Sequence, residues 1–278
     1  MSVTTELLHL PQAAALLLLV GGPVAIGLLM FWAVHRRLPV SMRRVHNDVA
    51  GFVFASIGVL YGVLLGFAVL VVWEEFNAAR ANASHECVAA VALSRDLDAY
   101  PRPEATAPVR AALLEHVRLI VTVEYPMLAR AVESAETTAA AEQIWKSLDT
   151  LQPQNAWEQS IYDHVLDRLN EMSEARATRL EDARNEVPSV LWIAIIGGGL
   201  LTVGFTCLFG TENVKAHAVM VVLLAALIGL VVYVTVELDH PFVGTVSIQP
   251  EGCDRLLRLD GLAPATPSMA ALPPALLR

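Results

Sequence analysis

The sequence predicts an all-α membrane protein with four transmembrane helices in two pairs and a helical extramembrane bundle between helices two and three. Hydrophobic residues make up 55% of its 278 residues, and the mean hydropathy is +0.52, which is too apolar for an ordinary soluble domain. Four long segments carry no charged residue, and each can cross a hydrocarbon layer of ~30 Å as a helix. No glycine occurs between Gly66 and Gly197, which favours helix over sheet in the polar segment between the pairs.

The four apolar segments divide the chain into predicted parts. The segments cover residues 12–34, 49–73, 188–209 and 218–236. Residues 1–73 then hold the first two transmembrane helices and their loop, 74–186 an acidic helical domain, 187–238 helices three and four, and 239–278 a C-terminal segment. The N-terminus has no Lys or Arg before its apolar run, and the run is too long for a signal peptide, so we expect an uncleaved first helix.

The second apolar segment has glycines at helical spacing. Gly58, Gly62 and Gly66 recur every fourth residue, and Gly51 extends roughly the same face. Glycine costs helix propensity, so such a stripe indicates close packing on another helix, of this chain or of another subunit. The predicted helix-packing or pore residues are Gly51, Gly58, Gly62, Gly66 and Trp73.

The first loop, residues 35–48, sets the predicted orientation. It contains Arg36, Arg37, Arg43 and Arg44, and short loops rich in Lys and Arg stay in the cytoplasm. The N-terminus, the 74–186 domain and the C-terminus are therefore expected outside the cell's inner (plasma) membrane. The 74–186 domain has 20 acidic and 11 basic residues, which argues against nucleic acid or anionic lipid as its partner.

Prolines mark the expected breaks within the 74–186 domain. Helix two should continue to about Tyr100, and a second helix should start near Pro108 and kink or stop at Pro126. A third helix should cover about 134–151, and a fourth should start at Asn155 as its N-cap. The apolar stripes expected in the core are Leu114, Val117, Val121 and Tyr125 on the second helix, and Trp157, Ile161, Val165, Leu169 and Met172 on the fourth.

The C-terminal segment after helix four is predicted to be short of regular structure. Residues 243–248 suit an extended piece and 250–259 a short helix. From Ala263 the chain is mostly Ala, Pro and Leu, and we expect a disordered tail.

No pattern in the chain indicates catalysis, a metal or a cofactor, so we expect none of the three. Cys87, Cys207 and Cys253 are odd in number and form no metal spacing; we expect no disulfide, although Cys87 and Cys253 could lie on the same side. The pairs Glu6/His9 and Glu237/His240 have a spacing found in metal sites, but we interpret them as solvated helix ends. The uncharged spans argue against an ion-coupled carrier and leave open a pore gated by wetting.

Residues spread along the chain resemble one known family. They are Asn47, Gly51, Phe52, Gly58, Tyr61, Leu64, Leu65, Phe67, Trp73, Glu86, Arg176, Arg179, Leu180, Pro188, Leu191, Trp192, Asp239, Pro241, Phe242 and Gly244. Their order and spacing are similar to those of the bacterial DUF4239, or bestrophin-like, proteins. The resemblance implies a four-span membrane protein related to bestrophins, which are oligomeric anion channels. It also marks family-motif candidates: Asn47, Glu86, Arg176, Arg179, Trp192, Asp239, Pro241 and Phe242.

Two functions remain open. One is an oligomeric ion-conducting protein that self-associates through helix two, with an ion as its ligand. The other is a membrane-anchored sensor or assembly protein whose outer bundle binds an unidentified protein partner or small ligand. The acidic domain would repel anions, which counts against a simple anion pore.

Overall fold

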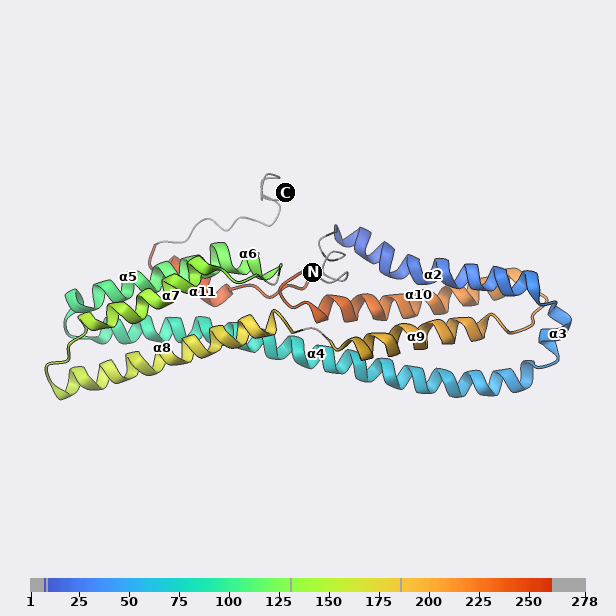
Figure 1. The fold of residues 1–278 in the computed structure, drawn as a ribbon, viewed down its shortest axis with the longest axis horizontal. Helices are drawn as coiled ribbons and strands as arrows, with labels where there is room; N and C mark the ends of the chain where they lie inside the picture. Colours follow the sequence, from blue (N-terminus) through green and yellow to red (C-terminus); the bar gives the residue numbers. More distant parts are fainter. Residues whose placement is uncertain (1–7, 9, 131, 186, 262–278) are drawn as a thin grey trace. The chain divides into compact units, whose positions relative to one another are not determined.

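The computed structural model describes residues 8, 10–130, 132–185 and 187–261, and they are helical with no strand among them (Figure 1). Four helices are long and apolar enough to cross a membrane: α2, α4, α9 and α10. The predicted fold class is therefore confirmed. The elements are α2 (Gln12–Arg37), α3 (Val40–Arg44), α4 (Asn47–Ala99), α5 (Pro103–Leu119), η1 (Ile120–Glu124), α6 (Tyr125–Leu128), α7 (Ala135–Ser147), η2 (Leu148–Thr150), α8 (Ala156–Asp182), α9 (Ser189–Thr206), α10 (Val214–Asp239) and α11 (Glu251–Leu259).

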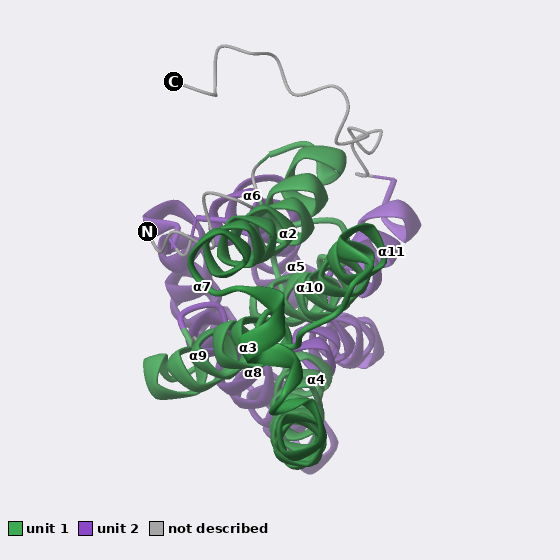
Figure 2. Cartoon of the chain, turned by 90° about the vertical axis from the view of Figure 1, so that its right-hand side faces the viewer, with its two compact units in different colours: residues 1–78, 185–247 green, residues 79–184, 248–278 purple. Residues whose placement is uncertain are grey.

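The chain forms two compact units, coloured separately in Figure 2. Unit 1 comprises Met1–Ala78 and Asn185–Ser247, and unit 2 comprises Ala79–Arg184 and Ile248–Arg278. Helices α2, α9 and α10 belong to unit 1, whereas α4 contributes its apolar first part to unit 1 and its polar second part to unit 2.

Close helix packing in unit 1 depends on small residues. A Cβ at Gly229 of α10 would lie 2.8 Å from the carbonyl oxygen of Leu19 in α2. A Cβ at Gly198 of α9 would lie 2.5 Å from the ring of Tyr61 in α4, and the Tyr61 hydroxyl donates to the Ile195 carbonyl at 2.9 Å. Glycine at these positions lets the helices approach closely, as is common in membrane bundles.

The loops at one end of unit 1 are joined by side-chain hydrogen bonds. The buried Arg43 donates from Nη1 to the carbonyls of Cys207 and Phe209 at 3.2 and 3.1 Å. Asn47 both donates to and accepts from the backbone of Gly210, at 2.8 and 2.9 Å. Because Arg43 and Asn47 both belong to the first loop, these bonds fix that loop to the residues at the end of α9.

Several predicted elements of unit 2 are confirmed. Helix α4 runs without interruption to Ala99, and Asn155 caps α8 by accepting from the Glu158 N–H at 2.9 Å. A short C-terminal helix is present as α11, over Glu251–Leu259. The predicted disordered tail lies outside the described residues.

Two predicted stripes, one predicted extended piece and the start of one helix need correction. Helix α5 begins at Pro103 rather than near Pro108, because proline is tolerated in the first turn of a helix. The buried face of α5 is formed by Val109, Leu113 and Val117, with Ile120 after it, so Leu114 and Val121 are only half-buried. The buried residues keep an α-helical spacing, and the expected stripe began one residue too late, at Leu114 instead of Leu113. Trp157 is 66% exposed at the start of α8, although the other four residues of its stripe are buried. Residues 243–246 form turns rather than an extended piece.

Candidate functional site

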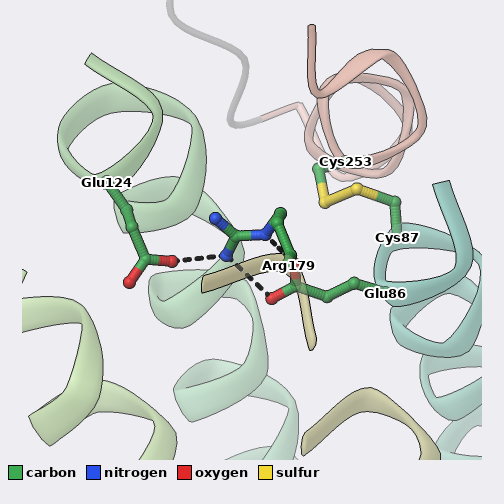
Figure 3. Close-up of a disulfide and its surroundings, with 5 residues drawn as sticks. All are labelled: Glu86, Cys87, Glu124, Arg179 and Cys253. Atoms are coloured by element: carbon green, nitrogen blue, oxygen red, sulfur yellow. Dashed lines mark hydrogen bonds and ion pairs between the residues drawn. A yellow bond between two sulfur atoms is a disulfide. The ribbon is translucent and has the colours of Figure 1, made fainter. Parts of the chain in front are cut away.

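A buried set of four charged side chains lies in unit 2, and we call it the ionic cluster: Glu86, Glu124, Arg176 and Arg179. Arg179 of α8 donates from Nε to Glu86 of α4 at 2.5 Å and from Nη2 to Glu124 of η1 at 2.5 Å. Arg176, one turn earlier on α8, donates to the other oxygen of Glu124 at 2.5 Å. Figure 3 shows the Arg179 guanidinium between the two carboxylates.

The charged side chains of the cluster are buried, so they interact strongly with one another. Glu86, Glu124 and Arg179 have no exposed side-chain surface, and Arg176 is 11% exposed. Burial by itself would raise the pKa of Glu124, but the charges and hydrogen bonds of Arg179 and Arg176 hold that pKa below its ordinary value. Glu124 is thus ionised at neutral pH, where it bonds two guanidinium groups.

Aromatic and imidazole rings surround the cluster. The Arg179 guanidinium lies 5.0 Å from the ring centre of Tyr125. His116 of α5 is fully buried and lies 3.2 Å from the Thr137 carbonyl through Nδ1, so Nδ1 carries the proton there. Burial, with the nearby Arg176, lowers the pKa of His116 to about 4, which makes it neutral at physiological pH.

A disulfide joins Cys87 and Cys253 beside the cluster (Figure 3). The expectation of no disulfide was therefore wrong. The two cysteines are 166 positions apart in sequence, and no spacing rule connects residues that only the packing of α11 on α4 brings together. Gly252 permits this approach, because a Cβ there would lie 2.9 Å from the Cβ of Cys87.

The cluster cross-links helices rather than offering a reactive centre. Its charges cancel, and each carboxylate is already bonded to a guanidinium. It ties α4, η1 and α8 together, and the disulfide adds α11. No group of three or more metal-ligating side chains occurs among the described residues. The cluster therefore joins three elements of unit 2 through buried ion pairs.

The predicted packing residues of α4 lie in unit 1 with an open face. A Cβ added at Gly51, Gly58, Gly62 or Gly66 would meet nothing within 4 Å, and Trp73 is 50% exposed. This contrasts with Gly198 and Gly229, which pack on helices of the same chain. The stripe thus has no packing partner in the part of the chain that the structure describes.

The remaining family-motif candidates lie in unit 1. The carboxylate of Asp239, at the end of α10, accepts from the Val187 N–H at 2.9 Å before α9 begins. Pro241 and Phe242 are buried beside it in the turn that follows, and Trp192 is half-buried on α9. Asn47 binds Gly210, as described above.

The expectation that Glu237 and His240 are solvated was wrong. Both are buried, and Glu237 accepts from the backbone and hydroxyl of Thr245 at 3.1 Å each. Gly244, with a φ of 82°, forms the turn that makes room for the Glu237 carboxylate. The other pair, Glu6 and His9, lies outside the described residues.

A family model described as the Bestrophin-like domain matches residues 21–253, which is most of the chain. The chain belongs to the bestrophin-like family. A comparison with curated proteins gave no match.

Solved structures share the bestrophin-like fold of this chain. A bacterial bestrophin homologue from Klebsiella pneumoniae, solved as a point mutant, has a TM-score of 0.60 at 13% identity and covers 87% of this chain and 98% of its own. Two structures described as a membrane protein, each with one substitution, have TM-scores of 0.59 and 0.57 at 15% identity. They cover 89% and 90% of this chain and 99% of theirs. At these identities the likeness concerns the fold alone.

In this bestrophin-like protein the structure brings together three predicted residues, Glu86, Arg176 and Arg179. The fourth member, Glu124, was missed by the sequence analysis. The signal was present, because Glu124 is the only charged residue in the apolar run from Leu119 to Tyr125, and a carboxylate in a buried run requires a cationic partner.

Proposed function

We propose that this bestrophin-like protein is an oligomeric, channel-like protein that conducts ions, with α4 at the contact between subunits. The observation that carries the proposal is the open glycine face of α4. Glycine lowers helix stability, and a glycine that faces only lipid makes no close helix contact to offset that loss. Four such residues on one face therefore favour a close-packed helix as neighbour, and a second copy of α4 is the partner that the described part of the chain leaves available.

Charge supports cations over anions as the permeating ions. Residues 74–186 carry a net charge of −9, and a negative vestibule concentrates cations and excludes anions. The spans carry no charged ring, so the narrow part of such a pore would be lined by apolar and small residues and gated by wetting.

We also propose that unit 2 lies outside the cell's inner membrane. The four arginines of the first loop favour a cytoplasmic position for that loop. The Cys87–Cys253 disulfide supports the same orientation independently, because structural disulfides persist in oxidising compartments and are rare in the cytosol.

The test is ion flux through liposomes that contain the full-length protein. We expect flux that is larger for monovalent cations than for chloride. Gly62→Leu should abolish it and reduce the oligomer on size-exclusion chromatography with light scattering. Gly22→Leu is the matched control, since Gly22 is also open within the chain but lies on α2. A purified oligomer that conducts under no ion gradient, or equal effects of the two variants, would refute the proposal.

A sensor or assembly role is the second candidate, and an exposed aromatic residue supports it. Trp157 of unit 2 is 66% exposed, and tryptophan is frequent among the residues that dominate protein interfaces. A crosslinked partner that is lost in Trp157→Ser, in a protein that does not conduct, would favour this role. Recovery of the protein itself alone would count against it.

A further inference from the structure

The end of unit 1 that carries the first loop combines exposed cations with exposed apolar side chains. The cations are Arg36 and Arg37 at the end of α2, Arg44 on α3, and Lys215 at the start of α10. The apolar side chains are Trp32, Leu38, Met42 and Val45, all exposed. We call this set of eight residues the basic end.

Contacts inside unit 1 hold these residues at one end of the spans. The rings of Phe31 in α2 and His217 in α10 lie 5.0 Å apart, edge to face. Arg44 forms an ion pair with Glu212, in the loop before α10. The Arg36 guanidinium lies 3.9 Å from the ring centre of Trp32. The basic end is thus formed by two loops that the fold places side by side.

The charge of the basic end is only partly neutralised. Glu212 is paired with Arg44, whereas Arg36, Arg37 and Lys215 have no ion pair among the described residues. Asp48 is an exposed carboxylate in the first loop. Three cations are therefore available to a negatively charged partner.

The apolar residues of the basic end identify that partner as a membrane surface. Met42 and Val45 are 61% and 78% exposed. If this loop lay in water, both apolar side chains would face solvent. Apolar side chains between arginines at the end of membrane spans are typical of segments that lie in the headgroup region. Buried Arg43 fixes α3 to the end of α9 through two carbonyls, so these side chains are held in position.

We propose that the basic end binds anionic phospholipid headgroups through Arg36, Arg37 and Lys215, with Met42 and Val45 inserted at the level of the acyl chains. Each basic residue near an anionic surface strengthens such binding about fivefold. Lipid binding requires only that the four spans lie in a bilayer. A protein that conducts no ions could therefore still bind lipid in this way.

Native mass spectrometry of the full-length protein in detergent tests this inference, with phosphatidylglycerol or phosphatidylcholine added. We expect tighter binding of phosphatidylglycerol, by at least about fivefold, and loss of the preference in Arg36→Gln/Arg37→Gln/Lys215→Gln. The matched control is Arg95→Gln/Lys146→Gln/Arg255→Gln, which neutralises three exposed cations of unit 2 and should keep the preference.

Three outcomes would overturn the inference. One is equal binding of the two lipids by the unmodified protein. Another is a preference that survives in the Arg36/Arg37/Lys215 variant. The last is full displacement of phosphatidylglycerol by excess inorganic phosphate, which would indicate a phosphate site rather than a lipid surface.

Discussion

Arg179 is the residue on which unit 2 depends most. Its guanidinium has no exposed surface and bonds two carboxylates that are themselves buried. Removing an ion from water costs several kcal/mol, which a buried partner offsets only while the pair is intact. The loss of one member is therefore more harmful than the net stabilisation by the cluster suggests.

We predict that Arg179→Ala lowers the free energy of unfolding by about 3–5 kcal/mol, because Glu86 is left buried without its cation. Denaturant unfolding of the full-length protein in detergent measures the loss. Arg184→Ala is the control, since the Arg184–Glu133 pair is exposed and should contribute about 1 kcal/mol or less. Similar losses in the two variants would contradict a structural role for the cluster.

His116 should make the stability of unit 2 depend on pH. Its folded pKa of about 4 lies below its ordinary 6.5, so the unfolded chain binds the proton more readily. Stability is then complete above pH 6.5 and declines as the pH falls toward 4, by about 3 kcal/mol in total at 1.36 kcal/mol per unit. The depressed pKa of Glu124 acts in the same direction but at lower pH.

Hydrogen exchange of the α5 and α7 amides between pH 4 and 7, corrected for intrinsic rates, measures this dependence. In His116→Gln the decline in stability between pH 6.5 and 4 should be much smaller. An unchanged profile in the variant would assign the dependence to another group.

At the level of helices, glycines in similarly apolar segments have opposite surroundings. Gly229 is packed against the backbone of α2, whereas Gly58 on α4 has open space within the chain. The sequence pattern around both is apolar, so it does not distinguish a contact inside the chain from one between subunits.

We predict opposite effects of alanine at these two positions on the stability of the isolated subunit. Gly229→Ala should destabilise it by about 1–3 kcal/mol, because the new Cβ would lie 2.9 Å from the Cα of Val20. Gly58→Ala should be neutral or stabilise by up to about 1 kcal/mol through helix propensity. Thermal unfolding at a detergent excess that yields monomers makes the comparison. Destabilisation by Gly58→Ala under those conditions would show a contact within the chain.

At the scale of the whole molecule, the C-terminal helix completes unit 2. Besides its disulfide to α4, α11 buries Leu256 and Leu257. Asp260, directly after it, pairs with Arg110 of α5 at 2.5 Å. Residues far apart in the sequence therefore stabilise one core.

We predict that Cys87→Ala/Cys253→Ala lowers the free energy of unfolding by about 2–5 kcal/mol, as removal of a disulfide that closes a long loop typically does. Alkylation of cells under denaturing conditions, followed by mass spectrometry, should find Cys87 and Cys253 oxidised and Cys207 as a thiol. Cys207→Ala is the control that leaves the disulfide intact. Finding Cys87 reduced in cells would contradict an extracytoplasmic unit 2.

The sequence by itself determined the four spans, the long α4, the N-cap at Asn155 and the family, because hydropathy, helix breakers and capping act over one or a few turns. The resemblance to the family, rather than these local rules, placed Glu86, Arg176 and Arg179 among the candidates. Only the tertiary structure decided that Glu124 joins them, that α11 is bonded to α4, and which glycines pack within the chain. These features depend on residues as far as 166 positions apart, and local rules, which act over one or a few helical turns, do not reach that far.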